Sequence, residues 1–148
     1  MKNKAVFNYP IEVVYQAIAQ LIVDNANAYN DNKYTLDTVH KIDYKFKIET
    51  TMGPFMNYSK VVDVKPNESI SYTIHREKME KYLVTYNLIK ESDDKTRLDY
   101  RYELETDKKS DSLNHMLVSW LYKLKQNKKF KEMRDYLNTQ CELIVSNK

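Results

Sequence analysis

The sequence is short of the residues on which many sites are built. Gly53 is its single glycine, whereas phosphate-binding loops need several glycines so that the backbone can approach a phosphate closely. Cys141 is its single cysteine, so no internal disulfide can form and a reducing compartment is favoured. The three histidines, His40, His75 and His115, lie far apart and lack metal-ligand spacing. We therefore expect no cofactor and no metal.

Long apolar runs and a strong charge imbalance are also missing. No stretch approaches the roughly 18 apolar residues of a membrane-spanning helix, and the first residues lack the apolar core of a signal peptide. The 24 Lys and Arg residues nearly balance 21 Asp and Glu, and a net charge of +3 does not by itself indicate nucleic acid. We expect a cytoplasmic protein with no nucleic-acid partner and no integral membrane segment. The length predicts one domain over residues 1–148.

The chain opens with a short strand that leads into a helix. Pro10 suits the first turn of a helix, where its missing N–H is not needed. Apolar residues then recur at helical spacing, namely Ile11, Val14, Tyr15, Ile18, Leu21 and Ile22. The turn-rich segment 24–32 is expected to end this helix.

From Lys41 onward the apolar period changes from 3.6 to 2. Five alternating runs follow, at residues 42–48, 58–64, 70–74, 82–88 and 98–104, with short polar turns between them. Clean alternation predicts an antiparallel meander with one buried face. Residues 112–145 return to helical spacing with two apolar stripes that drift out of phase across residues 126–129, so we expect a bend or a break there. The first stripe is Leu113, Leu117, Trp120, Leu121 and Leu124, and the second is Phe130, Met133, Leu137, Cys141 and Ile144.

A sheet followed by one long helix predicts an α+β fold in which the curved sheet wraps the helix. On a parity count, seven strand tyrosines share the inward phase: Tyr44, Tyr58, Tyr72, Tyr82, Tyr86, Tyr100 and Tyr102. A buried tyrosine packs its ring but needs a partner for its hydroxyl. Such a face suits either a cavity for an amphipathic ligand or a core filled by strand-favouring rings whose hydroxyls reach the rim.

The order of these parts resembles the helix-grip fold of the START-like (SRPBCC) superfamily. The opening FNYPIEVVYQAI at residues 7–18 is similar to the first strand and helix of that superfamily. The segment TTMGPFMNYSKVVDVKPNESISYTIHREKMEKYLVTYNLI and the later LDYRYELE are similar to a domain of unknown function from low-GC Gram-positive bacteria. The resemblance implies a single START-like domain and a sheet–helix cavity that holds hydrophobic small molecules. The superfamily also includes polyketide cyclases, so some of its members are enzymes.

We therefore interpret the protein as a non-catalytic binding module for an apolar or aromatic small molecule. The residues expected to line its cavity are Tyr44, Phe46, Tyr58, Tyr72, Tyr86, Tyr100, Tyr102, Leu117, Trp120 and Leu121, with Arg76 at the mouth. We expect no catalytic residue, because a tyrosine with a pKa near 10 is a poor general base at neutral pH. Two alternatives stay open: an enzyme resembling polyketide cyclases with pocket tyrosines as proton donors, and a protein-interaction domain with a filled cavity. The sequence indicates no oligomeric state.

Overall fold

The computed structural model describes residues 2–29, 31, 33–77, 81–104 and 113–147, with the backbone alone at position 50 and over residues 113–125. The elements along the chain are β1 (Lys2–Phe7), α1 (Ile11–Asn27), the 3-10 helix η1 (Leu36–Lys41), β2 (Asp43–Thr50), β3 (Gly53–Lys65), β4 (Ser69–Arg76), β5 (Lys81–Ser92), β6 (Lys95–Leu104) and α2 (Leu113–Ser146). The order matches the expected one, with a helical opening, a run of strands and a long closing helix.

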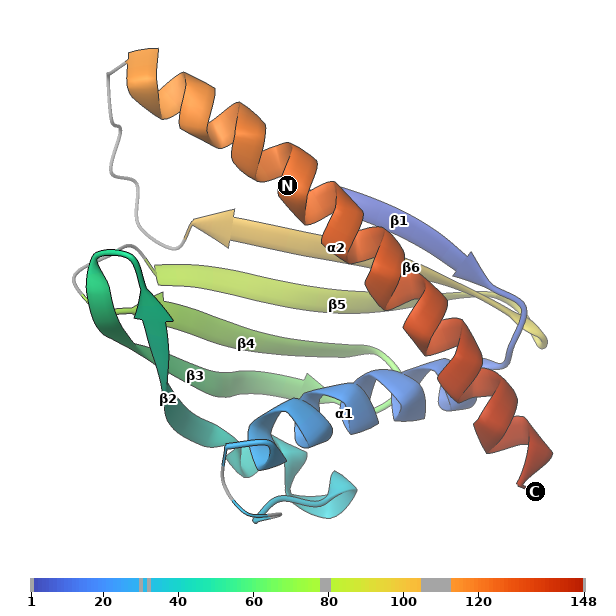
Figure 1. Ribbon diagram of the computed structural model, residues 1–148. Helices are drawn as coiled ribbons and strands as arrows, with labels where there is room; N and C mark the ends of the chain where they lie inside the picture. Colours follow the sequence, from blue (N-terminus) through green and yellow to red (C-terminus); the bar gives the residue numbers. More distant parts are fainter. Residues whose placement is uncertain (1, 30, 32, 78–80, 105–112, 148) are drawn as a thin grey trace.

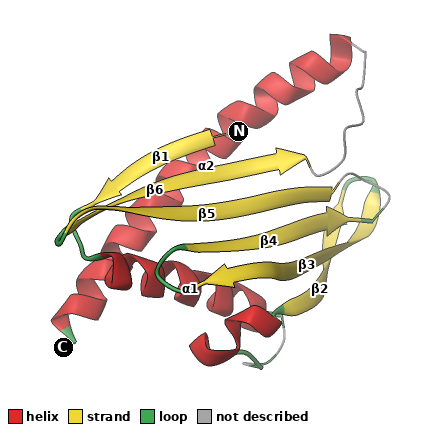
Figure 2. Cartoon of the chain, turned by 180° about the vertical axis from the view of Figure 1, so that it is seen from behind, coloured by secondary structure: helices red, strands yellow, loops and turns green. Residues whose placement is uncertain are grey.

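The strands form one antiparallel sheet in the order β1-β6-β5-β4-β3-β2. Strands β2 to β6 form a meander, and its last strand, β6, pairs with the N-terminal strand β1 (Figure 1). Both helices lie on the same face of the sheet, and the opposite face carries no helix when seen from behind (Figure 2). This is the predicted helix-grip architecture, with an antiparallel sheet that curves around the helices.

Helix α1 begins where the sequence places it. Pro10 occupies the N-cap, and its carbonyl oxygen accepts hydrogen bonds from the backbone N–H groups of Val13 and Val14 at 3.0 and 3.1 Å. Glu12 lies in the first turn, where a negative charge is favourable. The helix buries one face against the sheet and α2, made of Val13, Val14, Ala17, Ile18, Ala19, Ile22, Val23 and Ala26. It ends at Asn27, inside the segment that predicted its end.

Helix α2 is continuous over its 34 residues, so of the bend or break expected at residues 126–129 the break is wrong. The helix contains no glycine or proline, and its many Lys, Gln and Glu residues are good helix formers. Its second apolar stripe is buried as predicted, with Phe130, Leu137 and Cys141 in the core. The first turns of the ribbon project beyond the outline of the strands (Figure 1), so the apolar stripe can change phase without a break in the helix.

A β-bulge in β3 changes which side chains face the helices. Val61 pairs with Tyr72 and Asp63 pairs with Ser71, which leaves Val62 as the extra residue. Before the bulge the odd-numbered side chains of β3 are buried, and after it Val64 packs against the core. The parity count assumed one uninterrupted strand, so it assigned the wrong face to the residues that precede the bulge.

Candidate ligand-binding cavity

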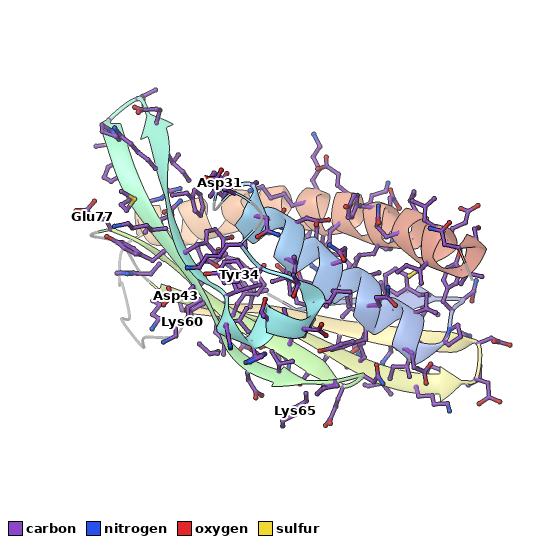
Figure 3. All side chains as sticks on the ribbon, turned by 90° about the horizontal axis from the view of Figure 1, so that it is seen from below. Asp31, Tyr34, Asp43, Lys60, Lys65 and Glu77 are labelled. Carbon is purple, nitrogen blue, oxygen red and sulfur yellow. The ribbon has the colours of Figure 1, made fainter. Side chains whose placement is uncertain are left out.

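A cavity of about 290 Å³ lies between the end of α1 and the strands β2, β3 and β4. Aliphatic, aromatic and uncharged polar side chains form its wall, namely Ile22, Asn25, Ala28, Tyr29, Ile42, Tyr44, Phe46, Ser59, Val61, Tyr72 and Ile74. This volume lies at the lower end of the range of about 300–1,000 Å³ that is typical of small-molecule sites. Seen from below, the region where α1 meets β2 is marked by Asp31, Tyr34 and Asp43 (Figure 3).

The strand register places the cavity-facing side chains next to one another. Tyr44 and Phe46 are two residues apart on β2, so they share one face of the sheet. Ser59 pairs with Tyr44 on one side and with Ile74 on the other. The next row along the strands pairs Val61 with Tyr72. Three neighbouring strands therefore contribute a continuous wall.

Tyr29 closes one side of this wall from the end of α1. Its ring stacks on Phe46 with a centroid distance of 4.4 Å and an interplanar angle of 20°. Tyr44 lies 6.1 Å from Tyr29 and 5.8 Å from Phe46, with interplanar angles of 12° and 23°. The three rings are thus nearly parallel, although the side chain of Tyr29 is itself 55% exposed.

A set of hydrogen bonds fixes the end of α1 to the start of β2. The Asn27 side chain donates from Nδ2 to the carbonyl oxygen of Tyr34 and accepts at Oδ1 from the Tyr34 backbone N–H, both at 2.8 Å. The Tyr34 hydroxyl donates to the carbonyl oxygen of Asp43 at 2.8 Å and accepts from the Asp43 N–H at 3.1 Å. These four contacts, the Asn27–Tyr34–Asp43 clamp, hold the segment that carries Tyr29 beside Tyr44.

Two tyrosines of the wall, Tyr44 and Tyr72, are kept protonated by burial. Burial raises the pKa of Tyr44, while a hydrogen bond with Ser59 opposes that rise. The pKa of Tyr72 lies well above its usual value, because of burial and then because of its neighbour Tyr86. At neutral pH these hydroxyls can donate or accept hydrogen bonds, but they cannot serve as bases. Among the described residues that line the cavity, none carries a formal charge.

Three of the expected cavity residues belong instead to a cluster beside the cavity. Tyr86 contacts Tyr100 edge to face with ring centroids 5.2 Å apart, and its hydroxyl lies 3.3 Å from the sulfur of Met133 on α2. Tyr100 packs on Phe130 at 5.4 Å. Tyr102, which is partly buried, lies 4.9 Å from Tyr82. Burial raises the pKa of Tyr86 and of Tyr100. Tyr100 and Tyr86 therefore pack against Phe130 and Met133 of α2.

Tyr58 lies on the opposite face of the sheet, so its expected inward position is wrong. It precedes the bulge, its side chain is 43% exposed, and its ring is 6.2 Å from that of His75. Arg76 is inward in register, opposite the buried Asn57, whose Oδ1 accepts from the arginine Nε at 3.4 Å. Arg76 lies two residues beyond the lining residue Ile74 and does not itself line the cavity.

The expected contribution of α2 to the cavity stays a prediction. The side chains of Leu117, Trp120 and Leu121 fall outside the described residues, and so does the predicted burial of Trp120. Tyr44, Phe46 and Tyr72 are the predicted residues that the structure brings together around the cavity that it describes.

Sequence reasoning missed the wall that α1 contributes. Tyr29 and Asn25 lie in or beside a turn-rich segment that carries no periodic signal. Ser59 was overlooked because the bulge reverses the parity of its strand. The signal that could have identified this wall is the polar, turn-rich segment 24–32, which connects the first helix to the strands.

The described residues offer neither a metal site nor a membrane-spanning helix. They hold no group of three or more His, Cys, Asp or Glu side chains placed to bind a metal ion. Neither α1 nor α2, within the part of the chain that the structure describes, is long and apolar enough to cross a membrane.

Comparisons with known proteins identify the family and the fold. Residues 1–123 match the family described as "Domain of unknown function (DUF3284)". None of the curated proteins matches the sequence. A START superfamily protein from Mycobacterium smegmatis is 10% identical, with a TM-score of 0.56 over 97% of both chains. Ara h 8.0201 is 11% identical, with a TM-score of 0.60 over 94% of this chain and 97% of that one.

A third solved structure shows the same likeness. The di-domain ARO/CYC StfQ from the steffimycin biosynthetic pathway is 13% identical with a TM-score of 0.57, and the match covers 99% of this chain and 46% of that one. At these identities the likeness shows the fold alone. The family match spans most of the sequence, and the chain therefore belongs to the DUF3284 family, with a START-like helix-grip fold.

Proposed function

We propose that the protein binds an apolar or aromatic small molecule, without catalysis, in the cavity between α1 and β2–β4. The observation that carries this proposal is the cavity of about 290 Å³ with a mainly apolar and aromatic wall. A cavity of this kind with a few polar groups is the usual form of a small-molecule site. A small apolar ligand in this cavity would be stabilised because its apolar surface and that of the wall would be removed from water.

The chemistry of the wall supports binding over catalysis. A general acid or base works best when its pKa lies near the working pH. Burial moves the pKa of Tyr44 and of Tyr72 upward, away from neutral pH. Ser59 shares its hydrogen bond with Tyr44 and has no histidine beside it in the wall. These groups suit the recognition of a ligand better than the transfer of its protons.

The sheet also offers a position for a polar end of the ligand. Arg76 continues the inward row of β4 past Ile74, toward the end of the strand. We propose Arg76 as the residue at the mouth of the cavity, with Asn57 holding its guanidinium. Arg76→Ala is then expected to weaken a ligand with an acidic tail and to leave a neutral ligand unaffected.

The test is titration with N-phenyl-1-naphthylamine, a neutral dye whose fluorescence rises in apolar surroundings. The wild-type protein is expected to bind the dye at one site and to gain melting temperature with its occupancy. Ala28→Trp places a large ring on an exposed, helical position of the wall and is expected to lower the affinity at least about tenfold. The matched control, Gln16→Trp, adds the same ring to an exposed position of α1 away from the cavity.

Two results would overturn the proposal. One is wild-type protein that does not bind the dye, and the other is equal weakening by both tryptophan variants. In either case the protein-interaction alternative would gain support. Native mass spectrometry of the purified protein provides a second readout, because a ligand that co-purifies with the wild type is expected to be missing from the Ala28→Trp variant.

A further inference from the structure

We propose, resting on the proposed function, that the cavity selects a flat, neutral aromatic ligand bearing a hydroxyl group over a saturated ligand with the same ring framework. Four aromatic side chains line the cavity from three elements: Tyr29 follows α1, Tyr44 and Phe46 lie on β2, and Tyr72 lies on β4. An acyl chain or a saturated ring could occupy the same cavity but would not make aromatic ring–ring contacts with its wall. The inference therefore concerns what the wall recognises.

Three of the aromatic rings in the wall share nearly the same plane orientation. Tyr29, Tyr44 and Phe46 lie within 23° of one another in every pair. A flat ligand in the same orientation presents its face or edge to several rings at once. Such contacts strengthen binding beyond what the burial of area alone provides. A saturated ligand gains the burial but does not gain this addition.

The uncharged wall favours a neutral group inside the cavity. The described lining residues carry no formal charge, and a charged group placed among them would lose its hydration without gaining an ion partner. A neutral ligand avoids that loss. The Ser59 hydroxyl already shares a hydrogen bond with Tyr44, and Asn25 adds an amide at the end of α1. These polar groups can hydrogen-bond one ligand hydroxyl.

Tyr29 is the residue on which this selectivity depends most. It contacts both Phe46 and Tyr44 by stacking, yet more than half of its side chain is exposed. Removing its ring therefore changes the wall without opening a void in the core. Tyr29→Leu keeps an apolar side chain but removes the aromatic ring. Tyr136→Leu makes the same exchange at an exposed position on α2 and is the matched control.

The experiment compares three ligands built on the same fused two-ring framework by displacement of N-phenyl-1-naphthylamine at neutral pH. They are 2-naphthol, its saturated counterpart decahydro-2-naphthol, and the anion 2-naphthoate. 2-Naphthol is expected to bind roughly threefold to tenfold more tightly than decahydro-2-naphthol and also more tightly than 2-naphthoate. Tyr29→Leu is expected to bring the ratio of the first two close to one, and Tyr136→Leu to leave it unchanged.

The outcomes separate this inference from the proposed function. Equal or tighter binding of decahydro-2-naphthol to the wild type would overturn the aromatic selectivity and keep the cavity as an apolar site. Tighter binding of 2-naphthoate than of 2-naphthol would overturn the preference for a neutral ligand. If the dye binds and none of the three displaces it, the dye occupies another place and the proposed function fails as well.

Discussion

Among the described residues, the concave face of the sheet is filled where α2 covers it from residue 126 onward and hollow where α1 ends. Under α2 the rings of Tyr86, Tyr100 and Phe130 pack against one another, and Leu137 and Cys141 are fully buried. Beyond the last turn of α1, side chains of the same kind surround a cavity instead. We call these two regions the filled half and the hollow half.

The difference between the halves follows from the helices, since the strands supply aromatic residues to both. Tyr72 belongs to both halves, because it stacks on Tyr86 at 6.1 Å and also lines the cavity. Helix α2 brings large side chains over β5 and β6. Helix α1 brings Ala26 and Ala28 near its end, with Tyr29 after it. The small residues at the end of α1 thus leave a cavity over their part of the sheet, whereas the large side chains of α2 fill the space over β5 and β6.

The largest effect is expected in the filled half. Leu137→Ala removes a fully buried side chain and is expected to lower the free energy of unfolding by about 2–5 kcal/mol. Leu143→Ala makes the same exchange on the same helix, where the side chain is 50% exposed, and is expected to cost less than about 1 kcal/mol. Urea unfolding measures both. Equal losses would show that α2 does not pack as the structure describes.

A pair of valines compares the two halves directly. Val61 and Val84 are both buried and lie on either side of Tyr72, but only Val61 is among the cavity-lining residues. Val84→Phe is expected to destabilise the protein by about 1–3 kcal/mol through overpacking. Val61→Phe can extend into the cavity, so it is expected to cost less than about 1 kcal/mol and to abolish dye binding. A greater loss of stability in Val61→Phe than in Val84→Phe would contradict the hollow half.

The Asn27–Tyr34–Asp43 clamp is expected to matter moderately. Asn27→Ala removes two hydrogen bonds to the Tyr34 backbone and is expected to cost about 1–2 kcal/mol. It is also expected to weaken dye binding, because the segment that carries Tyr29 loses its attachment. Asn25→Ala, on the same helix, is the control for stability. Thermal unfolding with and without the dye measures both effects, and an Asn27→Ala protein with unchanged stability and affinity would exclude a role for the clamp.

The last effect concerns alkaline pH and involves two buried groups of the filled half. Burial raises the pKa of Cys141 from 9.0 to about 11, and it also raises the pKa of Tyr86 above 10.0. The folded state therefore keeps these protons at a pH where the unfolded state has released them, so stability falls as the pH rises from about 9. Cys141→Ala is expected to flatten the fall between about pH 9 and 11, and Tyr86→Phe to flatten it above about pH 10.

Urea unfolding at a series of pH values measures this dependence. Tyr136→Phe, an exchange at an exposed position of α2, is the control and is expected to leave the slope unchanged. Stability that stays constant or rises between pH 9 and 11 in the wild type would show that these groups are not buried as the structure describes.

The elements could be predicted because their signals are local and repeated. Alternation over β2, β4, β5 and β6 and the helical spacing of α1 and of the second half of α2 each recur over several residues. The position of Tyr58 could not be predicted from parity, since one extra residue at Val62 reverses the face of everything before it. The break expected in α2 failed because a change in stripe phase does not by itself end a helix that has no glycine or proline.

The candidate site was predicted only in part, for a physical reason. Tyr44, Phe46 and Tyr72 line the cavity, while Tyr86 and Tyr100 have the same inward phase and are packed under α2. Strand alternation tells which face a side chain joins, but not which helix covers it. That depends on how α1 and α2 cross the sheet, which is set by tertiary packing and leaves no periodic mark in the sequence.

The central claim is that the hollow half holds a ligand. A crystal structure of the protein soaked with 2-naphthol tests it most directly, because it shows where the molecule binds. We predict density for the naphthalene ring between α1 and β2–β4, in contact with Tyr44, Phe46 and Tyr72 and nearly parallel to the Tyr29 ring. Density between the sheet and α2, or a cavity closed by these side chains with no ligand in it, would contradict the claim.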